Sequence, residues 1–330
     1  MLRIRGISYL LDDVSTDRLR QDLPIIRDEL HCTAVMIIGG DPDQLADAAA
    51  AVIDAGLDVW IRPHLLDRPW SDLLDQLRRV GRAAERLRQR FPDRVTLLVG
   101  SEFSHTARGI VPGSWSYLRL RIILRAHRLL RRRIDRRLDQ LLDRAAVTAR
   151  DVFSGPVSYA AASWEEVDWT RFDAVGVSLY RSGTDDEAYA RRVAALVRDH
   201  DRPVIITEFG CGAFAGAERR GPGSFRIVNW FTDPPVIRDD HPRDEETQAR
   251  YLGELIDLFA ETGVAGCFVF TYAMRGFPRR DDPRVDLDKA GFGIVAVPED
   301  GEPRPKAAFH QVARQYGELG RDRPEAGSDA

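Results

Sequence analysis

Short apolar runs alternate with helix-like stretches along almost the whole chain of 330 residues. This alternation is typical of a parallel α/β architecture, in which a helix returns the chain after each strand. Eight of the runs have the length and the β-branched content of buried strands. We predict strands over Ile4–Leu10, Ala34–Ile38, Leu57–Ile61, Val95–Val99, Val157–Ala161, Ala174–Leu179, Val204–Thr207 and Gly266–Tyr272.

Amphipathic stretches between these runs predict the helices. They cover Leu45–Ala55, Trp70–Arg90, roughly Trp115–Arg144, Glu187–Asp199, Asp244–Thr262 and Ala307–Tyr316. Eight strands with intervening helices match a single (β/α)8 barrel domain over residues 1–319, followed by a disordered tail over 320–330. A doubly wound sheet is the alternative, but its usual glycine-rich phosphate loop is absent after the first strand.

Composition excludes several classes of function. The net charge of -4 gives no global attraction to nucleic acid or to a membrane surface. No uninterrupted apolar run of 18 residues exists, so we expect no membrane partner, and the first residues lack the pattern of a signal peptide. Three widely spaced cysteines predict no disulfide framework and therefore a cytoplasmic protein. The histidines lack the spacing of a metal site, and we expect neither metal nor cofactor.

Two glutamates stand at the ends of predicted strands. Glu208 ends the strand Val204–Thr207, and Glu102 follows the strand Val95–Val99. In a barrel of parallel strands these tips face each other across the mouth, where chemistry is done. Glycoside hydrolysis commonly uses two facing carboxyl groups, one on each side of the glycosidic bond. The alternative is that each glutamate caps a helix or pairs with an arginine.

The order of motifs over the chain resembles that of the retaining (β/α)8 glycoside hydrolases of clan A. The motifs are Val99-Gly100-Ser101-Glu102, a strand ending in Tyr180, Thr207-Glu208-Phe209-Gly210, Phe268-Val269-Phe270-Thr271-Tyr272 and the closing segment Asp288–Val295. The resemblance implies that Glu208 is the nucleophile and Glu102 the acid/base. It also implies that Tyr180 hydrogen-bonds the nucleophile.

Two positions depart from this family pattern. Ser101 stands where the family has an asparagine that contacts the sugar 2-hydroxyl. Tyr272 stands where the family has a tryptophan that floors the sugar subsite, and we expect its ring to stack on a sugar. These changes point to an unusual glycoside, a transglycosidase, or a barrel recruited for other chemistry.

Four further residues are candidates for substrate binding. Arg62 and His64 follow the third strand, where a positive group can bind substrate or lower a carboxylate pKa; pairing of Arg62 with Asp67 is the alternative. His105 lies near Glu102 and is a candidate for contact with substrate, although the sequence slightly favours an exposed loop histidine. Trp230, in a long loop after Glu208, is a candidate sugar platform or an anchor for that loop.

An arginine-rich segment, Tyr117–Arg150, raises the question of nucleic-acid binding. Its apolar stripe, predicted to face the core, favours a solvated outer helix of the barrel and consists of Leu120, Leu124, Ile134, Leu138 and Leu141. We therefore expect a small-molecule or oligosaccharide partner and no nucleic acid. The leading hypothesis is a retaining glycosidase or transglycosidase. A non-catalytic barrel that serves as a binding module and a biosynthetic isomerase or cyclase remain alternatives. The oligomeric state stays open.

Overall fold

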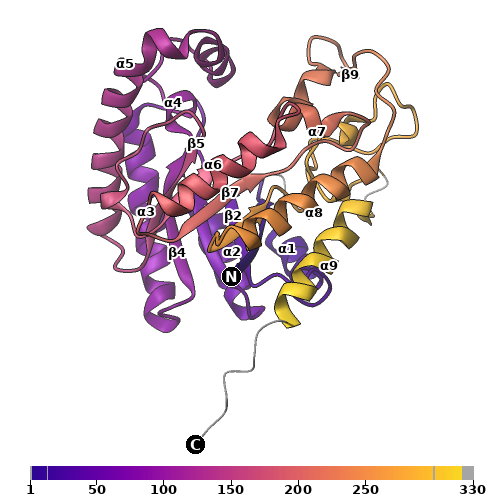
Figure 1. Ribbon diagram of the computed structural model, residues 1–330. Helices are drawn as coiled ribbons and strands as arrows, with labels where there is room; N and C mark the ends of the chain where they lie inside the picture. The colour runs from indigo at the N-terminus through magenta and orange to yellow at the C-terminus, as the bar shows by residue number, and fades with distance from the viewer. Residues whose placement is uncertain (1, 13, 300–301, 322–330) are drawn as a thin grey trace, which may run out of the picture.

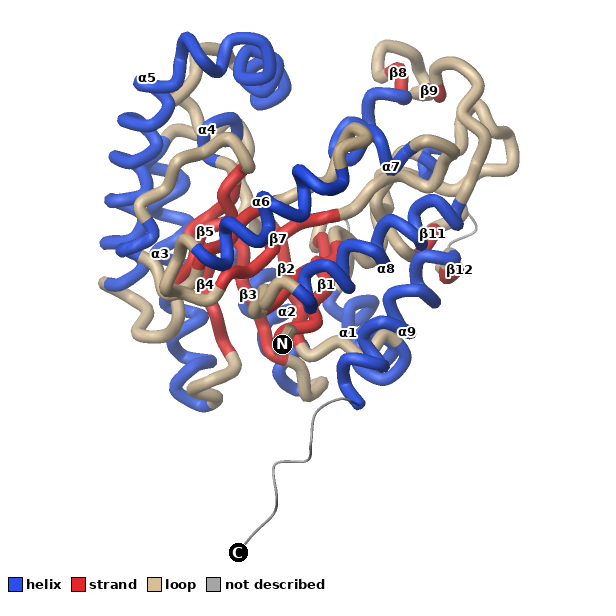
Figure 2. Tube along the Cα trace, viewed as in Figure 1, coloured by secondary structure: helices blue, strands red, loops and turns tan. Residues whose placement is uncertain are grey.

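The computed structural model describes residues 2–12, 14–299 and 302–321. Parallel strands close into a barrel in the order β1-β10-β7-β6-β5-β4-β3-β2, with the helices outside it (Figures 1 and 2). The barrel strands are β1 (Ile4–Leu10), β2 (Ala34–Gly39), β3 (Asp58–Pro63), β4 (Val95–Ser101), β5 (Val157–Ala162), β6 (Val175–Ser178), β7 (Val204–Phe209) and β10 (Gly266–Val269). The predicted (β/α)8 barrel is confirmed.

The principal helices of the outer layer lie where the amphipathic stretches predicted them. They are α2 (Pro42–Asp54), α3 (Trp70–Arg90), α5 (Ser116–Arg150), α6 (Asp186–Arg198), α8 (Glu245–Glu261) and α9 (Ala307–Arg321). Helix α1 (Thr16–Pro24) was not predicted from the sequence, because its pattern is short and ends at Pro24; a π-helical turn over Ile25–Glu29 follows it directly. The short helices α4 (Phe103–Thr106) and α7 (Ala217–Arg220) lie in the loops after β4 and β7.

Successive side chains of each strand point alternately into the barrel and out towards the helices, which produces two hydrophobic cores. One set of side chains points into the barrel and packs against itself; it contains Ala34, Met36, Ile38, Trp60, Leu98, Ala160, Ala174, Ile205 and Phe268. The other set packs against the helices. Gly6 belongs to the inner layer, and a Cβ there would lie 2.3 Å from the Phe268 ring, so the barrel interior is filled at this level. The ligand-accessible region is therefore confined to the loops above the inner core.

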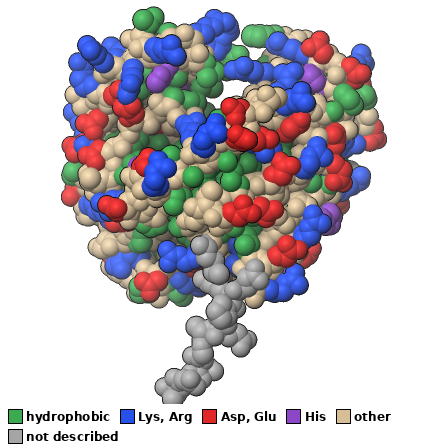
Figure 3. All heavy atoms as spheres, viewed as in Figure 1, with side chains coloured by type: hydrophobic (Ala, Val, Ile, Leu, Met, Phe, Trp, Pro, Cys, Tyr) green, Lys and Arg blue, Asp and Glu red, His purple; other side chains and the backbone are tan. Residues whose placement is uncertain are grey.

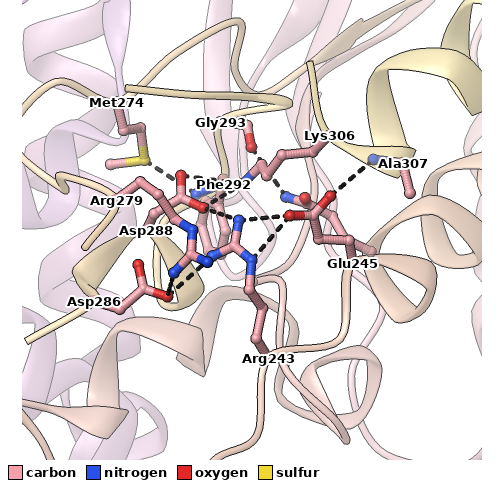
Figure 4. A network of polar contacts seen from close by, with 12 residues as sticks. Arg243, Glu245, Met274, Arg279, Asp286, Asp288, Phe292, Gly293, Lys306 and Ala307 are labelled. Atoms are coloured by element: carbon pink, nitrogen blue, oxygen red, sulfur yellow. Dashed lines mark hydrogen bonds and ion pairs between the residues drawn. The ribbon is translucent and has the colours of Figure 1, made fainter. Parts of the chain in front are cut away.

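The long loop after β7 is held by a buried network of ion pairs (Figure 4). Arg243, at its end, contacts Glu245 at 2.6 Å, Asp286 at 3.1 Å and Asp288 at 2.8 Å. Lys306, just before α9, reaches Asp288 at 3.3 Å and is almost completely buried. Three segments distant in sequence are thereby fixed to one another beside the barrel mouth.

The same loop contains a small hairpin, β8 (Val228–Asn229) and β9 (Val236–Ile237). Figure 1 shows this hairpin and the beginning of α5 at the upper end of the molecule, on opposite sides. A second small ribbon, β11 (Val295–Ala296) with β12 (Arg304–Pro305), precedes α9. These additions all lie on the segments that surround the mouth.

The C-terminal boundary differs from the prediction. Helix α9 continues to Arg321, beyond the predicted end at Tyr316 and into the predicted tail. The rest of the predicted disordered tail lies outside the described residues. Over the described ranges, no helix combines the length and the apolar character needed to cross a membrane.

Candidate active site

Glu208 lies near the end of β7, and two side chains hold its carboxylate. Tyr180, which follows β6, donates a hydrogen bond to Oε2 at 2.7 Å. Arg62, on β3, forms an ion pair with Oε1 through Nη1. Glu208 and Arg62 are both buried. The carboxylate is therefore fixed from two sides by donors. The family resemblance implied the bond from Tyr180, and for Arg62 the sequence left open substrate, a neighbouring carboxylate or Asp67 as its partner.

The contact of Arg62 decides between the two interpretations of this residue. Asp67, the alternative partner, pairs with Arg119 of α5 instead. Arg62 Nε is buried and has no hydrogen-bond partner within the described residues. A largely desolvated cation is thereby held directly against the Glu208 carboxylate.

Glu102 occupies a sharp turn directly after β4. Its backbone is left-handed, with φ 48° and ψ 46°, which is uncommon for a residue other than glycine. Gly100, two residues earlier, is also at positive φ (149°), and a Cβ there would collide with the Phe103 ring at 2.3 Å. This turn lifts the Glu102 side chain to the barrel mouth while Phe103 packs into the wall.

The two glutamates interact electrostatically. Burial, followed by the negative charges of Glu208 and Glu165, raises the pKa of Glu102 to about 8. Ser178, whose hydroxyl interacts with Glu102, is the strand partner of Glu208 in the β6–β7 register. The structure thus brings Glu102, Glu208 and Tyr180 together, with a protonated carboxyl group beside an ion-paired carboxylate at neutral pH.

Two histidines lie in this region, His105 next to Glu102 and His64 close to Arg62 and His105. His105 Nδ1 lies 3.5 Å from Glu102 Oε2. Burial, with the nearby charge of Arg119, lowers the pKa of His105 to about 4. Burial and the charge of Arg62 lower the pKa of His64 to about 3. Both rings are half-buried rather than exposed, and both are neutral near pH 7, so they can offer hydrogen bonds to a ligand but no charge.

A third carboxylate, Glu165, was missed by sequence reasoning. It lies behind Glu102, where Oε1 accepts from the Ser104 amide at 2.8 Å and Oε2 accepts from the Tyr159 hydroxyl at 2.9 Å. The Tyr159 hydroxyl in turn accepts from the Phe103 amide at 2.6 Å. Glu165 therefore supports the turn that carries Glu102. It lies in the loop directly after β5, and that position after a strand is the only signal that could have marked it.

The predicted sugar platform Tyr272 is not part of the open mouth. Its side chain is 2% exposed, and its ring stacks on Tyr9 at 5.7 Å between centroids. The predicted eighth strand is shorter than expected, and its inward-facing layer continues from Phe268 to Phe270 rather than to Tyr272. Phe270 is half-buried and packs on the inner core, 6.1 Å from Phe292 between ring centroids.

An aromatic wall leads outward from Tyr180. The centroid of Phe292 lies 5.9 Å from that of Tyr180 and 4.4 Å from that of Phe225. Phe225 contacts Phe277 at 5.4 Å, and Phe277 contacts Trp230 at 5.5 Å. Trp230 therefore anchors the loop, and about half of its surface (49%) remains exposed. Its role as a sugar platform stays a prediction.

Ser101 is buried and makes no contact with either carboxylate that the structure records. It lines a small enclosed cavity between β4 and α3, together with His64, Phe103 and Gln76. Cys32, Cys211 and Cys267 are free and buried. Among the described residues no group of three or more His, Cys, Asp or Glu side chains has the arrangement of a metal site.

Comparison with known proteins identifies the architecture. No family model and no curated protein matches the sequence. Among solved structures, a GH113 beta-1,4-mannanase is similar at a TM-score of 0.65 and 14% identity, over 96% of this chain and 99% of that one. A beta-glucosidase matches at 0.59 and 13%, over 94% and 89%. The chain has the fold of the (β/α)8 glycoside hydrolases of clan A.

Some structural relatives are much longer proteins. A Bacteroides uniformis beta-glucuronidase is similar at a TM-score of 0.59 and 18% identity, over 95% of this chain but only 35% of that one. The barrel therefore corresponds to one part of such an enzyme. At these identities the likeness concerns the fold alone, and the assignment of chemistry depends on the side chains at the mouth.

Proposed function

We propose that this protein is a retaining glycosidase or transglycosidase. The observation that carries the proposal is the pair of carboxyl groups at the barrel mouth in opposite electrostatic settings. Glu208 is ion-paired with Arg62 and hydrogen-bonded by Tyr180, whereas Glu102 is held protonated by burial and by neighbouring negative charge. A nucleophile must be ionised and a general acid must carry a proton, so each residue is prepared for one role.

In the first step, Glu208 attacks the anomeric carbon of the substrate. The bond from that carbon to the leaving oxygen breaks, and the oxygen takes the proton of Glu102. In the second step, Glu102, now ionised, removes a proton from water or from an acceptor hydroxyl. The resulting oxygen nucleophile displaces Glu208 from the sugar, and the free carboxylate is restored.

The surrounding side chains suggest how a sugar is held. His105 is a neutral donor or acceptor beside Glu102, and His64 is a second neutral ring close to Arg62. The aromatic wall from Phe292 to Trp230 offers aromatic surface. Aromatic faces and a few placed polar groups are the usual composition of a small-molecule site. Arg62 is committed to Glu208, so its role is to hold the nucleophile rather than to bind substrate directly.

The proposal is tested by a screen of aryl glycosides with the wild-type protein and the Glu208→Gln variant. We expect turnover of at least one glycoside, reduced by at least about 10³-fold in the variant. Unchanged turnover in Glu208→Gln contradicts the assignment. Saturable sugar binding without turnover of any glycoside supports instead the non-catalytic binding module.

A further inference from the structure

The first half of α5 exposes large apolar side chains together with arginines. Trp115, at its start, is 69% exposed, Tyr117 67% and Leu129 88%, and Leu118 and Leu124 are also exposed. Tyr117, Leu118, Arg121, Leu124 and Arg125 have the spacing of one helical face. We call this surface the α5 face. It consists of the residues just named together with Trp115 before them and Arg128 and Leu129, which follow Ala126.

The charge of this region is of one sign. Residues 107–134 contain eight arginines and neither aspartate nor glutamate. Arg125, Arg128 and Arg132 form no ion pair with any residue that the structure describes. Figure 3 shows basic and hydrophobic side chains gathered at the upper end of the molecule over α5.

The opposite side of the helix is firmly fixed, so the exposed side chains have a defined orientation. Arg119 is fully buried and pairs with Asp67. It also donates to the carbonyl oxygens of His105 at 2.7 Å and Gly113 at 2.9 Å. Ile123 is buried on the same side, and α5 bends at Ala126, whose φ of -133° is not helical. The bend sets the first half of α5 apart from the part that covers the barrel.

We propose that the α5 face binds the surface of an anionic lipid bilayer. Exposed leucines leave water only against an apolar partner, and arginines without a carboxylate partner can pair with an anionic surface. A bilayer containing anionic lipids supplies both, with headgroups for the arginines and acyl chains for Leu124 and Leu129. Trp115 and Tyr117 are residue types that settle at the boundary between these regions.

Other binding partners would contact only some of the side chains of the α5 face favourably. Nucleic acid would pair with the arginines and leave the leucines in water. A second copy of the chain docked through the same face would bring two sets of arginines together. The lack of a spanning helix does not bear on the proposal, because a helix that lies in the interface needs none.

Binding through this face would direct the barrel mouth towards the bilayer. The α5 face and the β8–β9 hairpin flank the same end of the molecule, which is hollowed between them (Figures 1 and 3). Arg119 connects this helix to the backbone of His105, three residues after Glu102. The surface and the candidate active site are therefore neighbours, although the binding proposal does not depend on any catalytic activity.

The test is co-sedimentation of the full-length protein with vesicles of phosphatidylcholine, with and without phosphatidylglycerol. We expect binding that requires phosphatidylglycerol and weakens as salt is raised. Arg121→Gln with Arg125→Gln should weaken it by about tenfold or more, as should Leu124→Gln with Leu129→Gln. The matched controls, Arg82→Gln with Arg86→Gln on α3 and Val147→Gln on the second half of α5, should bind like the wild type.

A second measurement does not depend on the stability of these variants. Tryptophan fluorescence of the wild type should shift to shorter wavelength on adding anionic vesicles, and Trp115→Phe should abolish most of the shift. Failure of the wild type to bind anionic vesicles overturns the proposal, as does binding that both double variants retain. Binding of duplex DNA or RNA, or self-association lost in the arginine variant, without vesicle binding, identifies a different partner and likewise overturns it.

Discussion

Tyr180 donates its phenolic hydrogen to Oε2 of Glu208 at 2.7 Å, from the loop after the neighbouring strand. Arg62 occupies Oε1 of the same carboxylate from β3, so the group is fixed in position and orientation. Burial and the charge of Glu208 raise the pKa of Tyr180 well above its usual range, so its proton remains available for this hydrogen bond. The relationship assigns Tyr180 the role of positioning the proposed nucleophile.

Tyr180→Phe removes this hydrogen bond and leaves the rest of the ring. We expect kcat/KM to fall by about tenfold to a hundredfold, because a hydrogen bond to a charged group contributes about 1.5–3 kcal/mol. Steady-state kinetics on an accepted glycoside measures the effect. Tyr189→Phe is the matched control, since its hydroxyl donates to the Leu179 carbonyl and not to Glu208. Equal losses in the two variants would show that Tyr180 has only a structural role.

The pH profile reports the protonation of Glu102. Its pKa of about 8 predicts that kcat/KM falls above about pH 8 as the free enzyme loses the acid proton. Glu102→Gln should lack this alkaline limb. In this variant the rate on substrates with poor leaving groups should fall by about 10²–10⁴-fold. The rate on activated aryl glycosides should fall less, because their leaving groups need little protonation. An unchanged alkaline limb in Glu102→Gln would assign the acid to another residue.

Glu102 should also make the protein less stable as pH rises. Its pKa is about 8 in the folded protein and about 4.3 in an unfolded chain. The folded state therefore holds more protons between these values, and the free energy of unfolding contributed by this group falls across that window. The gain in melting temperature of Glu102→Gln over wild type should be larger at pH 8.5 than at pH 4.5. Glu187→Gln, at an exposed site, should show no such trend; a pH-independent difference for Glu102→Gln contradicts the raised pKa.

The strands, and the two candidate carboxylates at their tips, could be predicted because apolar runs and strand ends are local signals. Contacts between side chains of strands that are distant in the sequence leave no such local pattern. The pairing of Arg62 with Glu208 joins β3 to β7, and nothing near Arg62 distinguished it from a pair with Asp67. The position of Tyr272 depended on where β10 ends, and strand ends are less sharply determined by sequence than strand centres.

Other features were missed because their partners lie far away in the chain. The support of the Glu102 turn by Glu165 depends on the packing of β5 beside β4. The apolar stripe of the arginine-rich helix was predicted as a core-facing stripe throughout. In the structure Leu124 belongs to the exposed face instead, because α5 bends at Ala126 and its first half is held by Arg119.

The ion-pair network beside the mouth should be essential to stability. Arg243→Met leaves the buried carboxylates of Asp286 and Asp288 with fewer cations, and breaking a buried pair in this way costs about 3–5 kcal/mol. Denaturant unfolding measures the loss. The control Arg191→Met removes an exposed pair with Glu187, for which we expect less than about 1 kcal/mol. A loss below about 1 kcal/mol in Arg243→Met would contradict this role of the network.

The identity of the nucleophile can be tested by trapping it. A 2-deoxy-2-fluoro glycoside with a good leaving group slows release of the sugar from the enzyme, and mass mapping of the digested protein then locates the attached sugar. The account predicts one sugar per chain on the peptide that contains Glu208, and none in Glu208→Gln. A sugar attached to another residue, or turnover of the parent glycoside with no covalent species even under rapid quenching, would contradict it.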